Sequence, residues 1–181
     1  MNINVALSLF FFLCLSFFPS LNATPDIAKT CNKVRHKELC ISSFEGSHIA
    51  RFIPSNAKPK VVASIIIKIT VSNASDVSRN LKTAVLGGLV PLTPEVRAKY
   101  GICDREVASA MKELDKVRTT MAISSRKSED LDMKAAIANT DKCEEELKQV
   151  EAQLPDKKQF EEVVVLKQLL ENIDDIIKAM D

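Results

Sequence analysis

The feature that most constrains the fold is a run of apolar residues with helical spacing between residues 96 and 121. Its members recur at alternating steps of four and three residues, which places them on one face of an α-helix and is typical of helices that pack in bundles. Thr93 and Pro94 supply an N-cap and a first-turn proline, so the helix is predicted to begin there. The stripe consists of Val96, Tyr100, Cys103, Val107, Ala110, Leu114, Val117 and Met121.

Three further segments have the same kind of apolar face. The first spans residues 58–86; its Ile65–Ile67 stretch also fits a strand, but the helical period continues beyond it and the glycines at 87 and 88 end it. The third of the four helices should start near Ser128 or Asp130 and continue until Pro155, and the last should span residues 160–180. With only 4 Gly and 7 Pro, a turn-rich barrel is disfavoured. The sequence predicts an all-α fold, an up-down-up-down four-helix bundle over residues 58–181.

Residues 1–23 differ from the rest of the chain because they contain no charged side chain. Their unbroken apolar stretch, residues 5–18, has the length of a signal-peptide core and is short for a membrane span. Cleavage after Ala23 would leave residues 24–181 as the mature domain. An uncleaved membrane anchor is the alternative interpretation.

The cysteine content indicates an oxidising compartment. One of the 5 cysteines, Cys14, lies in the predicted signal peptide, and the mature chain keeps an even number. Spacing favours one bond between Cys31 and Cys40. Cys103 and Cys143 lie on two apolar stripes and are equidistant from residue 123, one residue before the predicted turn, so an antiparallel hairpin would bring them level. Free buried thiols are the alternative for this pair.

Three segments resemble a known family. Cys31-Asn32-Lys33-Val34-Arg35 is similar to a Cys-x-Lys-Thr-Arg start, residues 97–103 resemble an Arg-x-x-Tyr-x-x-Cys segment, and residues 135–143 resemble a Ser-Ala-Ala-Leu-Thr...Cys run. These motifs and both cysteine spacings resemble the plant invertase and pectin methylesterase inhibitor family. The resemblance implies that residues 24–57 form a helical hairpin packed on the bundle, and that the protein is a secreted inhibitor of a cell-wall enzyme.

The family divides between two target enzymes. Invertase inhibitors carry Pro-Lys-Phe in the loop between the second and third bundle helices, where this chain has Arg126-Lys127-Ser128. The resemblance therefore favours pectin methylesterase as the target. Inhibition of a cell-wall or vacuolar invertase through Arg126 and Lys127 is the alternative.

Charge is unevenly distributed along the chain. Residues 1–127 carry 18 basic and 9 acidic side chains, and residues 128–181 carry 7 and 15. These charges can steer a charged partner or pair between neighbouring helices. Because pectin is a polyanion, acidic groups on the third bundle helix could mimic it in the enzyme's cleft. The candidate contact residues are Glu129, Asp130, Asp132, Asp141, Glu144 and Glu145.

The residues that commonly perform catalysis are sparse. Both histidines, His36 and His48, lie near Glu38 and Glu45, but with Cys40 in a disulfide the set has no ligand spacing for a metal. The adjacent carboxylates at 144–146 and 174–175 should be exposed and unsuited to acid-base chemistry. We therefore expect a monomeric protein without enzymatic activity, metal or cofactor, which does not bind nucleic acid or, after signal cleavage, a membrane.

Two remaining features point to other roles. Asn73-Ala74-Ser75 is an N-glycosylation sequon within a predicted helix, which makes Asn73 a candidate glycosylation site. A carrier of a small ligand is a further functional alternative, and it would require an apolar cavity between the helices.

Overall fold

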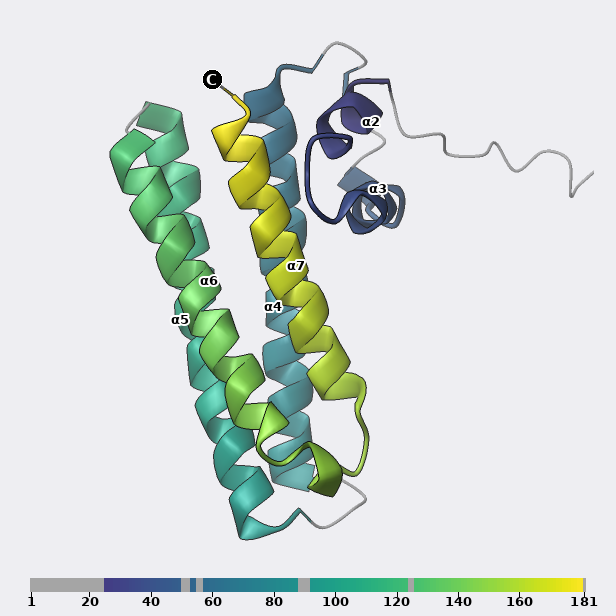
Figure 1. The fold of residues 1–181 in the computed structure, drawn as a ribbon, viewed down its shortest axis with the longest axis vertical. Coiled ribbons are helices and arrows are strands. Elements are labelled where there is room, and N and C mark those ends of the chain that lie inside the picture. The colour runs from purple at the N-terminus through teal and green to yellow at the C-terminus, as the bar shows by residue number, and fades with distance from the viewer. Residues whose placement is uncertain (1–24, 50–52, 55–56, 88–91, 124–125, 181) are drawn as a thin grey trace, which may run out of the picture.

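The computed structural model describes residues 25–49, 53–54, 57–87, 92–123 and 126–180, and the predicted signal peptide lies outside these residues. Four long helices run alternately up and down (Figure 1). They are α4 (Pro59–Gly87), α5 (Pro94–Ile123), α6 (Arg126–Lys148) and α7 (Lys158–Lys178). Each helix packs against two neighbours in the cyclic order α4, α5, α6, α7. The predicted four-helix bundle is confirmed.

The ends of the helices agree with the prediction at the start of α5 and differ from it at α6, which begins at Arg126 rather than near Ser128 or Asp130. The Thr93 hydroxyl accepts a hydrogen bond from the Val96 amide at 3.2 Å, as expected for an N-cap. The third bundle helix was expected to continue to Pro155, but α6 ends at Lys148 and a 3₁₀ turn, η2 (Glu151–Gln153), follows it. The chain therefore changes from α-helical to 3₁₀ geometry before Pro155, because 3₁₀ turns are common where α-helices end.

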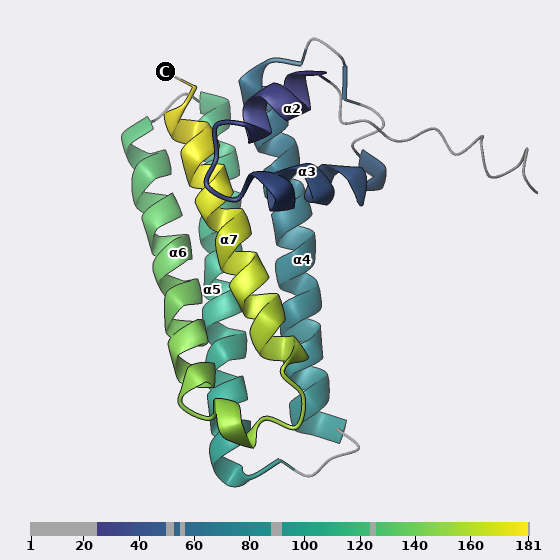
Figure 2. The same ribbon diagram turned by 45° about the vertical axis from the view of Figure 1, so that its right-hand side comes forward.

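A short helical hairpin precedes the bundle, as the family resemblance implied. It consists of α2 (Pro25–Cys31) and α3 (Lys37–Glu45), joined by the predicted Cys31–Cys40 disulfide. Both helices pack on α4 and α7, at the end of the bundle where α4 begins and α7 ends (Figure 2). The outer sides of α5 and α6 remain uncovered by the hairpin.

The core is divided along the bundle axis. One buried cluster joins the hairpin to the nearest half of the bundle and includes Phe44, Ile66, Leu114 and Leu170. The other fills the opposite half and includes both cysteines of the second disulfide. All eight residues of the stripe at 96–121 are buried. Among the described helices, α4 alone is long and apolar enough to cross a membrane, but 50% of its most apolar stretch is buried inside the bundle.

Candidate functional site

The α5–α6 pair is joined by a disulfide and by ion pairs. The predicted Cys103–Cys143 disulfide joins the two helices, with Cα atoms 4.3 Å apart. Two ion pairs cross the same seam, Lys99 with Glu146 and Lys142 with Glu106. These links hold two antiparallel helices as one unit, whose outer side is open to a partner.

The six acidic candidates do not share one exposed face, contrary to the prediction. Glu129 is only 6% exposed, because it lies four residues before buried Met133 and so follows the apolar stripe of α6. Asp141 and Glu144 face α7, where both pair with Lys167 at 2.7 and 3.0 Å. Their hydrogen bonds raise the pKa of Lys167 above its ordinary value.

The other three candidates lie elsewhere on α6. Asp130 pairs with Lys134 one turn later at 2.6 Å, and the hydrogen bond from Lys134 lowers the pKa of the carboxyl. Asp132 lies on the α5 side, where its charge contributes to the raised pKa of Lys116, after the larger effect of the Glu113 hydrogen bond. Glu145 is exposed, and its carboxylate has no hydrogen bond or ion pair with the described part of the chain.

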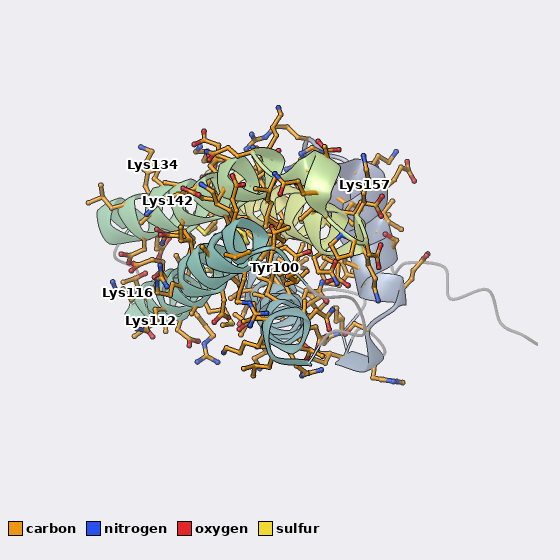
Figure 3. The ribbon with its side chains drawn as sticks, turned by 90° about the horizontal axis from the view of Figure 1, so that it is seen from below. Tyr100, Lys112, Lys116, Lys134, Lys142 and Lys157 are labelled. Carbon is orange, nitrogen blue, oxygen red and sulfur yellow. A yellow bond between two sulfur atoms is a disulfide. The ribbon has the colours of Figure 1, made fainter. Side chains whose placement is uncertain are left out.

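Positive charges also project from this surface. Figure 3 shows Lys112, Lys116, Lys134 and Lys142 extending outward from α5 and α6. Much of the charge asymmetry along the sequence is therefore neutralised by pairing within and between helices. The α5–α6 surface is mixed in charge rather than acidic, which weakens the prediction that it imitates a polyanion.

Arg126 and Lys127 lie in the first turn of α6 rather than in a polar turn between helices. Their side chains are outside the described part of the structure. The exposed side of α6 also carries an apolar side chain, Leu131, which is 60% exposed. Sequence analysis missed this residue, although its position between acidic neighbours and off the buried stripe marks it as outward-facing.

Tyr100 belongs to the core rather than to the partner surface. Its side chain is 0% exposed and lies near the bundle axis in Figure 3. The hydroxyl has no hydrogen-bond partner among the described residues. Burial, with a smaller contribution from Asp156, raises its pKa above the ordinary tyrosine value.

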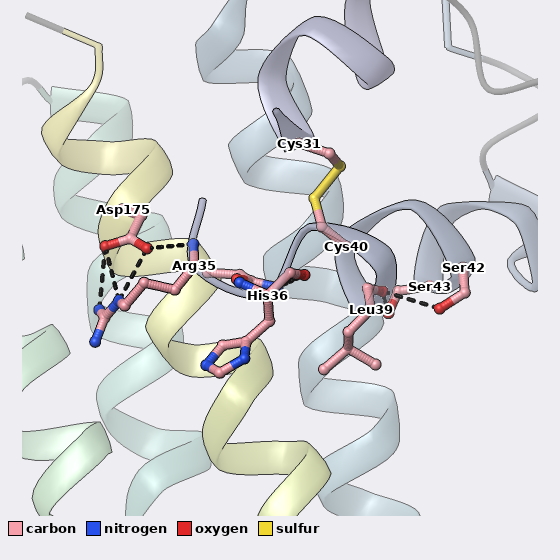
Figure 4. The surroundings of a disulfide bond; sticks show 9 residues. Cys31, Arg35, His36, Leu39, Cys40, Ser42, Ser43 and Asp175 are labelled. Atoms are coloured by element: carbon pink, nitrogen blue, oxygen red, sulfur yellow. Dashed lines mark hydrogen bonds and ion pairs between the residues drawn. A yellow bond between two sulfur atoms is a disulfide. The ribbon is translucent and has the colours of Figure 1, made fainter. Parts of the chain in front are cut away.

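A polar clamp that the sequence did not predict fixes the hairpin to α7 (Figure 4). The Arg35 guanidinium donates to both carboxylate oxygens of Asp175 at 3.0 to 3.2 Å, and the Arg35 amide donates to Asp175 at 2.9 Å. Asn172 accepts from the His36 amide and donates to the His36 carbonyl, both at 3.0 Å. The sequence signal for this clamp was Arg35, which matches the family's first motif.

One of the two histidines belongs to the clamp, and one carboxylate that was expected to be exposed is buried beside it. The His36 ring lies 2.6 Å from the Glu171 carboxylate on α7. Asp174 was expected to be exposed, but it is only 6% exposed, because the hairpin residue Arg35 and the helix residue Lys178 both contact it. These residues therefore link the hairpin to the bundle.

Two grooves border the hairpin. The larger, with a volume of about 430 Å³, lies between α3 and α4 and includes Ser43, Ile49, Ile69 and Asn73. The smaller, of about 170 Å³, includes Lys29, Lys33 and Pro59. Neither is an enclosed apolar cavity between bundle helices, so neither supports a carrier of an apolar ligand.

Comparisons with known proteins agree with this architecture. A family model described as plant invertase/pectin methylesterase inhibitor matches residues 25–176. The chain belongs to this family. The matched residues cover the hairpin and nearly the whole bundle, and family members are inhibitor proteins rather than catalytic enzymes.

The fold of this family member is similar to solved inhibitor structures. A mutant form of a pectin methylesterase inhibitor from Arabidopsis aligns with a TM-score of 0.69 at 18% identity, covering 84% of this chain and 95% of that chain. A pectin methylesterase inhibitor from Arabidopsis thaliana aligns with a TM-score of 0.63 at 17% identity, covering 86% and 96%. No curated protein sequence matches the chain significantly. At these identities the structural likeness establishes the fold alone.

Proposed function

We propose that this protein is a secreted inhibitor of pectin methylesterase that covers the substrate cleft of the enzyme and has no catalytic activity of its own. The observation that carries the proposal is the family match over residues 25–176. The two solved structures compared above are both pectin methylesterase inhibitors. The even number of cysteines in the mature domain, all in disulfides, is consistent with export to an oxidising cell-wall compartment.

The outer side of the α5–α6 pair is the proposed docking surface. A surface that is already rigid loses little conformational entropy on binding, and the Cys103–Cys143 bond supplies that rigidity. The hairpin occupies α4 and α7 and leaves this side free. Leu131 offers an exposed apolar anchor, and Glu145, two heptads further along the same helix α6, adds a carboxylate.

The mechanism we propose is steric occlusion with local charge contacts. Glu145 is the acidic candidate best placed to meet basic groups around a pectin-binding cleft, because it is exposed and its carboxylate has no partner among the described residues, whereas Asp130 already pairs with Lys134. Asp141 and Glu144 contribute less because Lys167 already neutralises them, and Glu129 is buried. This arrangement favours contacts spread along α5 and α6 over insertion of the segment that contains Arg126 and Lys127.

Titration of the purified secreted protein tests the target directly. We expect stoichiometric loss of pectin methylesterase activity, measured as methanol release, and no effect on a cell-wall invertase assayed in parallel. Inhibition of invertase alone would replace this proposal with the alternative target. Hydrolysis of pectin esters by the protein itself would contradict the inhibitor assignment.

Two variants and a matched control test the docking surface. The double variant Leu131→Arg with Glu145→Lys should raise the inhibition constant at least about tenfold, because it removes an anchor and reverses a charge. Val165→Arg on α7 is the control, since Val165 is also an exposed apolar helix residue, at 39% exposure. Arg126→Ala with Lys127→Ala should change inhibition less than the first variant. If that order is reversed, the first turn of α6 carries the binding energy and the helix-face mechanism is wrong.

A further inference from the structure

The groove between α3 and α4 has Asn73, the acceptor residue of the sequon at residues 73–75, in its wall. α4 contributes Lys68, Ile69, Ser72 and Asn73 to it, and the end of α3 with the following residues forms the opposite wall. The Asn73 side chain is half-buried and makes no hydrogen bond with other described residues. Its amide therefore lines an open volume of about 430 Å³ instead of a packed core.

We propose that Asn73 carries an N-linked glycan whose first sugars occupy the α3–α4 groove and brace the hairpin against the bundle. The proposal rests on the export that the proposed function requires, and it is independent of which enzyme is inhibited. The amide nitrogen of Asn73 forms a bond to C1 of the first sugar of a lipid-linked pyrophosphate oligosaccharide. The bond from C1 to the pyrophosphate oxygen breaks, the lipid pyrophosphate leaves, and the amide nitrogen gives up one proton.

The folded helix explains when this transfer must occur. The Ser75 hydroxyl, the third position of the sequon, donates to the Val71 carbonyl one turn earlier at 2.9 Å and lies 3.4 Å from the Met111 sulfur. Asn73 and Ser75 are therefore held in helical backbone with the hydroxyl occupied. The sugar must be attached during translocation, before α4 forms, and the groove receives it when the hairpin docks.

The chemistry of the groove suits an amino sugar. Ile49, 41% exposed, and Ile69 both line the groove and present apolar surface for the carbon-bound hydrogens of a sugar ring and for an acetyl methyl group. The Ser43 hydroxyl donates to the Leu39 carbonyl at 2.6 Å, so its oxygen still accepts a hydrogen bond from a sugar hydroxyl. Lys68 and His48 are exposed and have no ion-pair partner within the described ranges, which leaves both as donors to sugar oxygens.

A glycan in this position would strengthen the contact between α3 and α4, which the clamp does not reach. The hydrogen bonds of the clamp connect residues 35 and 36 to α7, whereas the α3–α4 contact is mainly apolar, through residues such as Phe44. A sugar bonded covalently to α4 and touching Ser43 and Ile49 would bridge the two walls. The expected result is slower opening of α3.

The test uses the full chain secreted from plant cells. Intact mass and peptide mapping should show a glycan on Asn73. The amides of α3 should exchange hydrogen about tenfold more slowly than in Asn73→Gln, the effect expected of one or two added hydrogen bonds. Trimming with an endoglycosidase that leaves the first sugar should preserve most of that protection.

A variant with the glycan moved to another helix distinguishes a sugar that occupies the groove from a general effect of glycosylation on hydrogen exchange. The variant Asn73→Gln with Ala138→Asn creates a sequon ending at Thr140 on the exposed side of α6, across the bundle from α3. It should be glycosylated without slowing exchange in α3. An unmodified Asn73 in the secreted protein, or equal protection from both glycan positions, would overturn the proposal. Neither result depends on pectin methylesterase inhibition, so the failure of one proposal is distinguishable from the failure of the other.

Discussion

Replacing Asn172 with alanine should release the helical hairpin from the bundle. The Asn172 side chain is 0% exposed and contacts the hairpin through both polar atoms of its amide. Its oxygen accepts from the His36 N–H and its nitrogen donates to the His36 carbonyl, each at 3.0 Å. Truncation removes both bonds at once: the His36 N–H loses its partner where the chain passes against α7, and the His36 carbonyl keeps only its hydrogen bond from the Cys40 amide at 2.9 Å.

The size of the effect follows from the His36 N–H, because the His36 carbonyl remains paired with the Cys40 amide. A buried N–H or C=O that loses its partner costs about 1 to 3 kcal/mol, and water reaches the His36 region in part, since its side chain is 30% exposed. We therefore expect a loss of about 1 to 3 kcal/mol. Alanine has a higher helix propensity than asparagine, which offsets well under 1 kcal/mol of that loss.

Two measurements test this prediction. Urea unfolding gives the change in the free energy of unfolding, and native-state hydrogen exchange shows whether the α3 amides open before those of α5. Asn139→Ala on α6 is the matched control, because Asn139 makes no hydrogen bond through its side chain to the described residues. If Asn172→Ala costs less than about 0.5 kcal/mol and leaves α3 exchange unchanged, the clamp does not hold the hairpin.

Three other predictions concern the core, the second disulfide and acid stability. Leu114→Ala should lower the free energy of unfolding by roughly 2 to 5 kcal/mol, since Leu114 is 0% exposed, and a loss below about 0.5 kcal/mol in urea would show that α5 is poorly packed. Replacing Cys103 and Cys143 with serine opens a loop of sequence separation 40 and should cost about 4 kcal/mol in the chain-entropy model, with unchanged stability contradicting it. Burial raises the pKa of Asp175, but its hydrogen bonds from Arg35 outweigh burial, so the folded pKa is lowered. The carboxylate therefore stabilises the fold above its unfolded pKa of about 3.9, and this contribution is lost as pH falls through the lower folded pKa. Asp175→Asn should flatten the pH dependence of unfolding below about pH 4, and an unchanged slope there would show that Arg35 does not stabilise the charged form.

The amino-acid sequence by itself determined the bundle and the cysteine pairing. Helical period, N-caps and glycine stops are local properties, so the ranges of α4, α5 and α7 could be read to within a few residues. The Cys103–Cys143 pair could also be predicted, because two residues equidistant from a turn meet in any antiparallel helical hairpin. The same reasoning could have placed Glu129 inside, since it lies in phase with Met133.

Only the tertiary structure decided which polar groups meet. His36 and Asn172 are 136 residues apart, and nothing in their local sequence indicates that they bond. Asp141 and Glu144 looked like free acidic residues until the packing of α7 placed Lys167 between them. Long-range polar contacts depend on the rotation and register of each helix against its neighbour. A repeating apolar stripe defines which face of a helix packs, but it does not define which charged residue of the neighbouring helix will lie next to that face.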